Sequence, residues 1–334
     1  MEKIKVAIIG CGGIHKKHSA AIREIEGAQL IVVCDTDEER AKASAQENNC
    51  AWTADYKEVL ANEEVQVVHL CLPHYLHASM SIEAMEAGKA VLLEKPLGMT
   101  SEEGRSVVEA QKKTGAFFGV CFQNRYRPVI NKLKSIMNSA EAGEILCGRA
   151  FVTWSRTDAY YKSASWRGTW AQEGGGVLIN QTIHTLDLLQ WMFGGVDMSK
   201  VKGSISNNSL SDVIEVEDTA DIRMVTNDGK VVLFYGTNAY TQNSQVLFDI
   251  TCENVSLRAE KELTVRWNDG RVETFTEEQA TGQHAYWGLD HDTLIRDFYA
   301  KYSAGEKFEI DAEEALKSLE IIDSVYKSSS MRKI

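Results

Sequence analysis

A lysine that follows a short apolar run is the first residue of the chain for which a chemical role can be argued. The stretch Ala90–Pro96 reads AVLLEKP, and its four apolar residues predict a buried strand that ends in Glu94 and Lys95. In an open α/β sheet, ligands bind beyond the carboxyl ends of the strands. Burial in a dry cleft lowers the pKa of a lysine, which can then donate and accept protons near neutral pH. Lys95 is therefore a candidate proton-transfer residue, with a surface lysine after an edge strand as the alternative.

A glycine-rich loop near the start of the chain predicts a nucleotide site. The apolar run Lys5–Gly10 (KVAIIG) predicts a strand, and it leads through Gly-Cys-Gly-Gly-Ile-His at 10–15 into a helical pattern. This is the context that a dinucleotide fingerprint requires. Gly10 permits a tight turn, and Gly12 lets the backbone approach a pyrophosphate at the helix N-terminus. His15 stands where the fingerprint has its third glycine.

An acidic residue follows the next predicted strand. The run Gln29–Cys34 (QLIVVC) ends in Asp35, 22 residues after Gly13. A carboxylate at this position binds the two hydroxyls of an adenosine ribose and repels a 2′-phosphate. NAD is therefore the expected cofactor, while the nearby Arg40 keeps NADP as an alternative.

Strands and helices alternate over residues 1–123. Further strand-like runs lie at 65–72, 90–93 and 116–122. Between the last two, a capping box at Thr100 opens a helix that ends at Gly115. Such alternation implies a doubly wound parallel sheet, so we predict an α/β Rossmann domain over residues 1–123.

Residues 124–334 predict a second domain of the α+β class. A helix is predicted over Val177–Phe193, and mostly strands follow beyond residue 200. Asn-Asp-Gly at 227–229 and again at 268–270 are hairpin turn signals. They predict a large, mostly antiparallel open sheet.

Two groups of residues in this second domain have the chemistry of a sugar site. The loop Thr157–Glu173 contains Tyr160, Tyr161, Trp166, Arg167 and Trp170. Aromatic rings stack on the C–H faces of sugars and polar tips bind hydroxyls, although such a loop can also simply cover the core. In the predicted helix, Asn180, His184 and Asp187 are spaced to share one face, which must be satisfied internally or line a pocket.

Composition limits the classes of partner. The chain has 334 residues, enough for two domains, and 36 basic against 48 acidic residues give a net charge of −12, which disfavours nucleic acid as a partner. None of the seven cysteines forms a CxxC pair, which favours a reducing compartment and no structural zinc. No apolar run is long enough for a signal peptide or a membrane span, so we expect a cytoplasmic protein with no membrane partner.

The motifs together resemble the Gfo/Idh/MocA family of oxidoreductases, which includes glucose–fructose oxidoreductase and inositol dehydrogenase. The resemblance rests on the glycine loop at 10–14, Asp35, Pro73 with His77, and the sequence Glu-Lys-Pro at 94–96. It implies that Lys95 is catalytic beside the nicotinamide and that the Lys95–Pro96 bond is cis. It also implies a homodimer or homotetramer formed through the open sheet.

The resemblance assigns further site residues and no metal ligand. The cofactor-binding residues would be Gly10, Gly12, Gly13, Ile14, His15, Asp35, Arg40, Leu72, Pro73, His77, Glu94, Lys95 and Gln123. The substrate-binding residues would be Lys95, Tyr161, Arg167, Asn180 and His184. Arg125 would also border the nicotinamide. His284 and His291 are interpreted as structural or pocket-rim residues.

One position departs from the family pattern. Where the family has an aspartate, this chain has Asn180, and an amide cannot take a proton as a carboxylate can. His184 is therefore expected to share the proton transfer with Lys95. Asp187 would either orient the His184 ring or make an inter-domain contact.

The expected activity is hydride transfer between a nicotinamide cofactor and a secondary alcohol or ketone. The substrate would be a sugar, a sugar derivative or an inositol. Two alternatives stay open. One is a glycoside-cleaving enzyme in which tightly held NAD oxidises the sugar transiently, and the other is a non-catalytic sugar or nucleotide sensor.

Overall fold

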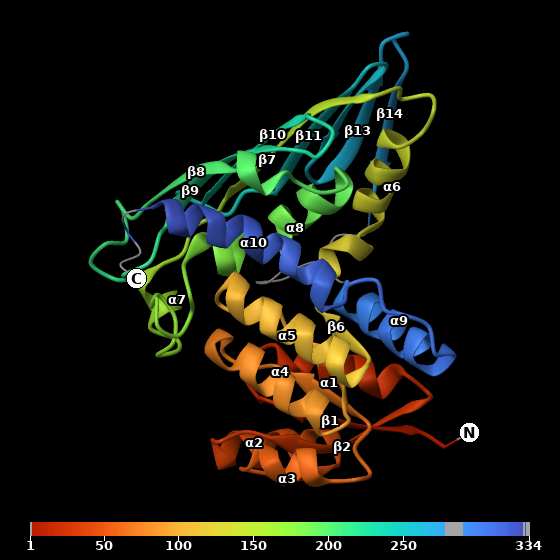
Figure 1. Cartoon of the computed structure of the whole chain (residues 1–334), viewed down its shortest axis with the longest axis vertical. Coiled ribbons are helices and arrows are strands. Elements are labelled where there is room, and N and C mark those ends of the chain that lie inside the picture. The colour runs from red at the N-terminus through yellow and green to blue at the C-terminus, as the bar shows by residue number, and fades with distance from the viewer. Residues whose placement is uncertain (1, 278–289, 330, 332–334) are drawn as a thin grey trace. The chain divides into compact units, whose positions relative to one another are not determined.

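The computed structural model describes residues 2–277, 290–329 and 331, and it divides into two compact units (Figure 1). The first unit comprises Met1–Gln123 and Leu289–Leu316, and the second comprises Asn124–Gly288 and Lys317–Ile334. The boundary after Gln123 coincides with the predicted one. The second domain is not continuous as predicted, because a segment near the C-terminus packs in the first unit. His284 lies outside the described residues.

The first unit contains a six-stranded parallel sheet, which confirms the predicted doubly wound fold. Its strands are β1 (Ile4–Ile9), β2 (Ala28–Cys34), β3 (Ala51–Thr53), β4 (Val67–Leu70), β5 (Ala90–Leu93) and β6 (Phe118–Val120). Their order is β3-β2-β1-β4-β5-β6, and every pair is parallel. The strand order reverses between β1 and β4, and in such folds ligands bind at that point.

Helices cover this sheet. They are α1 (His15–Glu24), α2 (Glu38–Asn48), α3 (Tyr56–Ala61), α4 (His77–Glu86), α5 (Ser101–Thr114) and α9 (His291–Ala304), with the short turn η1 (His74–Leu76) before α4. The cap at Thr100 is confirmed, because Thr100 accepts a hydrogen bond from the Glu103 N–H and Gly115 ends α5 at φ +67°. The Glu103 carboxylate accepts from the Met99 N–H, one residue before the position that a capping box requires. Helix α9 packs against α1, and its apolar residues Leu294, Ile295 and Phe298 are buried. This burial explains why residues 289–316 belong to the first unit.

The second unit contains an eight-stranded sheet. It is mostly antiparallel, as predicted. Its strands are β7 (Ile145–Thr153), β8 (Lys202–Ser206), β9 (Thr219–Val225), β10 (Val231–Thr237), β11 (Leu247–Cys252), β12 (Val255–Ala259), β13 (Glu262–Trp267) and β14 (Val272–Thr276). The order is β14-β13-β12-β11-β7-β10-β9-β8, and β7 and β10 form a parallel pair. Both predicted hairpin turns are present, with Gly229 and Gly270 at positive φ.

The helix predicted over Val177–Phe193 is interrupted at Thr182. The helical elements of the second unit are α6 (Pro128–Met137), α7 (Asp158–Tyr161), η3 (Val177–Gln181), α8 (Ile183–Met192), η4 (Met198–Lys200) and most of η2 (Gln123–Tyr126) and α10 (Ala312–Ser328). Element η3 is a π-helical turn, so the face argument for Asn180 and His184, which assumed 3.6 residues per turn, is wrong. The buried Glu217 carboxylate accepts hydrogen bonds from Gly176 N and Leu178 N at the start of this turn.

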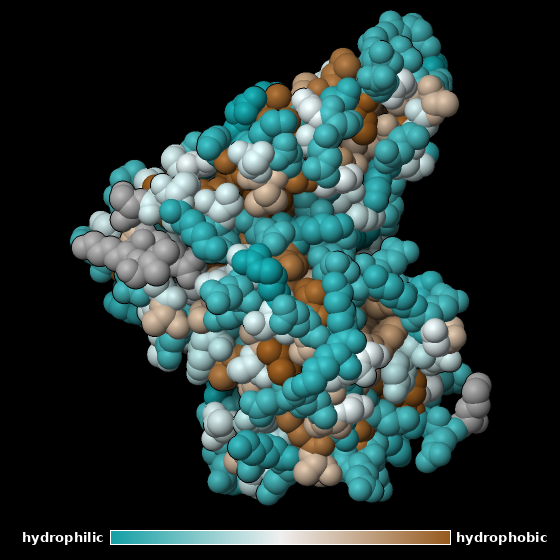
Figure 2. Space-filling view, in the orientation of Figure 1, coloured by the Kyte–Doolittle hydropathy of each residue, from teal (hydrophilic) through white to brown (hydrophobic). Residues whose placement is uncertain are grey.

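Hydrophilic residues cover most of the surface seen in Figure 2, and hydrophobic residues form smaller patches there. Among the residues that the structure describes, no helix has the length and hydropathy needed to cross a membrane.

Candidate functional site

The glycine loop after β1 has the shape of a phosphate cradle. Gly10 adopts φ +97°, and a Cβ there would lie 2.2 Å from the Cys71 carbonyl oxygen, so only glycine fits. A Cβ at Gly12 or Gly13 would meet nothing within 4 Å, which leaves open space above the loop. Helix α1 begins without a side-chain cap, whereas α2 and α5 have one. The Lys17 N–H donates to the Ile14 carbonyl oxygen, and no side chain caps the remaining N–H groups of the first turn, where dinucleotides bind.

Asp35 lies at the end of β2, directly beside this loop. Its Oδ2 accepts a hydrogen bond of 2.8 Å from Cys11 N, and its Oδ1 accepts one of 2.9 Å from Asp37 N. The Arg40 guanidinium donates to Asp35 at 3.1 Å and also pairs with Asp37. Asp35 is therefore held at the predicted ribose position, and the charge of Arg40 is already balanced by two carboxylates.

Among the buried polar atoms of the described residues that lack a hydrogen-bond partner, two lie shortly after strands β1 and β6 of the first sheet. They are His15 Nε2, in the first turn of α1, and Gln123 Oε1, shortly after β6. Because buried polar atoms are normally hydrogen-bonded, both atoms fit contacts to a bound ligand. The open glycine loop, Asp35 and these two buried atoms thus fit the requirements of a dinucleotide site.

His77 joins two of the loops that follow the strands. It is fully buried, with Nε2 2.8 Å from the Leu72 carbonyl oxygen and Nδ1 2.6 Å from the Pro96 carbonyl oxygen. Burial lowers the pKa of its ring. The Lys95–Pro96 peptide bond is cis, as the resemblance implies. His77 therefore holds the loop of Pro73 and the loop of Lys95 in place, whether or not it also contacts the cofactor.

The residue before the candidate lysine is a buried carboxylate. Glu94 is 6% exposed, and its Oε1 lies 2.9 Å from His18 Nε2 and 3.3 Å from His291 Nε2. Burial by itself would raise the pKa of the Glu94 carboxyl, but the hydrogen bonds from the two histidines hold it well below its usual range. Lys95, by contrast, is partly exposed. Sequence reasoning did not find His18, which lies 76 residues from Glu94, and it left the role of His291 open.

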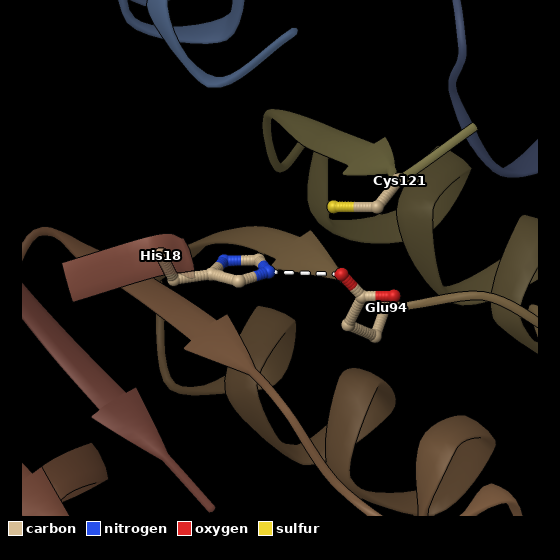
Figure 3. A group of neighbouring side chains, drawn as sticks. All are labelled: His18, Glu94 and Cys121. Atoms are coloured by element: carbon tan, nitrogen blue, oxygen red, sulfur yellow. Dashed lines mark hydrogen bonds and ion pairs between the residues drawn. The ribbon is translucent and has the colours of Figure 1, made fainter. Parts of the chain in front are cut away.

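Figure 3 shows Cys121 close to His18 and Glu94. One ligand atom from each of the three lies within 4.8 Å of the others, as in a metal site. Two ligands of one tetrahedral zinc lie about 3.3 Å apart, given zinc–ligand bonds of roughly 2.0–2.1 Å. The 2.9 Å between His18 and Glu94 is instead a hydrogen-bond distance. Burial also raises the pKa of the Cys121 thiol, which keeps it a poor ligand.

The second unit gathers a polar cluster around the Tyr160 hydroxyl. This oxygen accepts hydrogen bonds from Arg167 Nη1, from Gln181 Nε2 at 2.9 Å and from Asn180 Nδ2 at 3.4 Å. Asn180 Nδ2 also donates to the fully buried carboxylate of Glu173. The structure thus brings the predicted residues Arg167 and Asn180 together. Gln181 and Glu173 were missed, although Glu173 ends the loop that was singled out.

Tyr161 lies deeper than predicted for a sugar-stacking residue. It is 4% exposed and packs in a hydrophobic cluster with Ile214 and Val216. Its hydroxyl accepts a hydrogen bond of 3.0 Å from Asn238, which donates a second one to Gln181 Oε1. The hydroxyl is therefore the part of Tyr161 that is linked to the polar cluster, through Asn238 and Gln181.

Asp187 forms a buried ion pair with Arg125. The guanidinium donates two hydrogen bonds to the carboxylate, at 2.7 and 2.6 Å, and Ser318 Oγ donates a third at 3.1 Å. All three residues belong to the second unit, so the inter-domain interpretation of Asp187 is wrong for this pair. Arg125 therefore has a structural partner of its own. His184 lies in the first turn of α8 and is partly exposed.

Comparison with known proteins identifies the protein family to which this chain belongs. Residues 4–122 match the family model described as "Oxidoreductase family, NAD-binding Rossmann fold", and residues 130–258 match the "GFO/IDH/MocA C-terminal domain". The first unit is thus an NAD-binding Rossmann domain. The chain belongs to the Gfo/Idh/MocA family of oxidoreductases, as the resemblance of its motifs implied.

Individual relatives are moderately similar. The crystal structure of the WlbA dehydrogenase from Chromobacterium violaceum in complex with NADH and UDP-GlcNAcA is 32% identical with a TM-score of 0.84, and the match covers 98% of this chain and 94% of that one. Oxidoreductase P35 of Formosa agariphila is 29% identical over 63% of this chain and 66% of its own length. The scyllo-inositol 2-dehydrogenase (NAD(+)) of Bacillus subtilis is 27% identical over 60% of this chain and 57% of its own length. The chain therefore spans about two thirds or less of these two curated relatives.

Proposed function

We propose that the protein is a dehydrogenase that transfers a hydride between NAD and a secondary alcohol or ketone of a sugar, a sugar derivative or an inositol. The observation that carries the proposal is that Gly10, Asp35 and Lys95 follow the carboxyl ends of β1, β2 and β5 in one parallel sheet. The relatives support the substrate class, because one is crystallised with NADH and a nucleotide sugar and another is named an inositol dehydrogenase.

We assign the following roles to the residues of this protein. The glycine loop and Asp35 would bind the two phosphates and the adenosine ribose, and Leu72, Pro73 and Gln123 would line the rest of the cofactor site. NAD, when bound, supplies the hydride acceptor. Lys95 would accept the hydroxyl proton during oxidation and return it during reduction, with His184 sharing this transfer. Arg167, Asn180 and the hydroxyl of Tyr161 would hold substrate hydroxyls.

We further propose that NAD is preferred to NADP. Asp35 would repel a 2′-phosphate, and Arg40, which could attract one, is paired with Asp35 and Asp37.

A homodimer or homotetramer through the sheet of the second unit is supported by the exposed apolar residues Leu146, Leu233 and Val272 on its strands. A cytoplasmic location is supported by the cysteines, all of which are free thiols.

The experiment that tests the activity follows absorbance at the NADH band. Purified protein and NAD are mixed with a panel of sugars, polyols, inositols and nucleotide sugars with a carboxylate, such as UDP-GlcNAcA. We expect NADH to form with at least one member and the signal to vanish in Lys95→Ala. No NADH, with cofactor already bound and a glycoside being cleaved, would favour the glycosidase alternative. Binding of a sugar without any turnover would favour the sensor.

A further inference from the structure

A chain of hydrogen-bonded rings leads from helix α9 to Glu94 inside the first unit. The Tyr299 hydroxyl lies 2.9 Å from His69 Nε2, and His69 Nδ1 lies 2.8 Å from His18 Nδ1. His18 Nε2 in turn lies 2.9 Å from Glu94 Oε1. All four side chains are buried, with exposures between 0 and 6%.

When both rings are neutral and Glu94 is ionised, one placement of protons satisfies every contact in this chain. Burial lowers the pKa of both His18 and His69, so each ring is neutral and carries one proton. The Glu94 carboxylate can only accept, so His18 carries its proton on Nε2 and accepts at Nδ1. His69 must then donate from Nδ1, and its Nε2 accepts from the Tyr299 hydroxyl. Every donor is therefore oriented toward Glu94.

We propose that Tyr299 and His69 are positioning residues that act through His18 to keep Glu94 ionised beside Lys95, and thereby set the pH at which Lys95 exchanges its proton. The inference rests on the proposed function of Lys95. Glu94 and Lys95 are consecutive residues, and a carboxylate near an ammonium group favours the charged form of the amine. Burial alone would neutralise Glu94, so its negative charge depends on its hydrogen-bond donors, of which this chain supplies His18.

Other titratable groups face Glu94 from the neighbouring elements. His291, at the start of α9, is close enough to donate a second hydrogen bond to Oε1. The thiols of Cys71 and Cys121, after β4 and β6, are kept neutral because burial raises their pKa. His77 is held by backbone carbonyls. His18, His291 and the Cys121 thiol are thus hydrogen-bond donors to this carboxylate among the described side chains.

The first test is the pH dependence of kcat/KM for oxidation of a panel substrate. Lys95 must be neutral to accept a proton, so removing the charge of Glu94 should let it lose its proton at lower pH. We expect Glu94→Gln and His18→Leu to shift the acid limb of the profile down by about one pH unit. His69→Leu and Tyr299→Phe should shift it in the same direction by less. His18→Gln should restore the wild-type profile, because its amide N–H can replace the donor at Nε2.

Tyr302→Phe is the matched control, since Tyr302 lies one helical turn after Tyr299 on α9 and is half-buried against Phe117. Its profile should equal that of the wild type. An unshifted acid limb in His18→Leu, His69→Leu and Tyr299→Phe, each with normal NAD binding, would overturn the proposal. So would a shift in Tyr302→Phe as large as that in Tyr299→Phe.

The second test does not need the substrate. In protein labelled with ¹⁵N-histidine, ring nitrogen shifts above the ordinary pKa of histidine should show neutral His18 protonated at Nε2 and neutral His69 protonated at Nδ1. The opposite tautomer at either ring would overturn the proposal, as would stoichiometric zinc that is lost in Cys121→Ser. If the expected tautomers are found but no panel member yields NADH, the proposed function is refuted. The role of the hydrogen-bonded rings in setting the pH of the reaction is then refuted with it.

Discussion

The Asp35 carboxylate accepts a hydrogen bond of 2.8 Å from the backbone N–H of Cys11, in the middle of the glycine loop. The residue expected to bind the ribose therefore also holds the loop expected to bind the phosphates. The two parts of the cofactor site are coupled through this bond, and a change at Asp35 alters both.

Asp35→Ala should weaken NAD binding by about tenfold or more, because it removes a ribose acceptor and the bond to Cys11 N, each worth about 1–3 kcal/mol when lost. Isothermal titration with NAD measures the effect. Asp37→Ala is the control, since Asp37 caps α2 and pairs with Arg40. Unchanged NAD affinity in Asp35→Ala would remove the ribose assignment.

Lys95→Ala should lower kcat by about 10²–10⁴-fold, the range for loss of a general acid–base group, and leave NAD affinity nearly intact. Stopped-flow formation of NADH separates the chemical step from binding. Lys113→Ala, at an exposed position on α5, should behave as the wild type. A near-normal rate in Lys95→Ala would exclude the lysine from proton transfer.

Asn180→Asp restores the carboxylate of the family pattern, yet it should impair this protein. Asn180 donates to the buried Glu173, so an aspartate would place two carboxyl groups in one buried site, where both cannot ionise without repulsion. We expect a lower Tm than the wild type, with the deficit larger at pH 8 than at pH 5. The double variant Asn180→Asp with Glu173→Gln should recover most of the loss. Full stability of Asn180→Asp at alkaline pH would contradict the assigned contact.

Glu217 should make the protein less stable as the pH rises toward neutrality. Burial raises the pKa of this carboxyl from 4.5 to about 7 in the folded protein. Between these two values the folded state binds more protons than the unfolded state, so the free energy of unfolding falls as pH rises through this window and is then constant. The total effect is about 3 kcal/mol. Thermal unfolding of the wild type and Glu217→Gln between pH 4.5 and 8 checks it, and parallel curves would refute it.

The sequence by itself determined the first sheet except for its edge strand β3, the glycine loop, Asp35 and the position of Lys95 after a strand. These features are local: a buried parallel strand is a short apolar run, a tight turn needs glycine, and a cap lies within three residues of the helix it begins. For the same reason the hairpin turns of the second sheet were predictable from Asn-Asp-Gly. The departure of Asn180 from the family pattern was also readable from the sequence.

Only the tertiary structure decided what surrounds these residues. Tyr299 meets His69 across 230 residues of sequence, and Arg125 meets Asp187 across 62. The π-helical turn at Asn180 depends on Glu217, which lies 39 residues beyond Leu178. Contacts of this kind leave no periodic or local pattern, because they arise from how separate elements pack. They nevertheless decide which polar groups are buried, which protons they carry and which carboxylates stay charged.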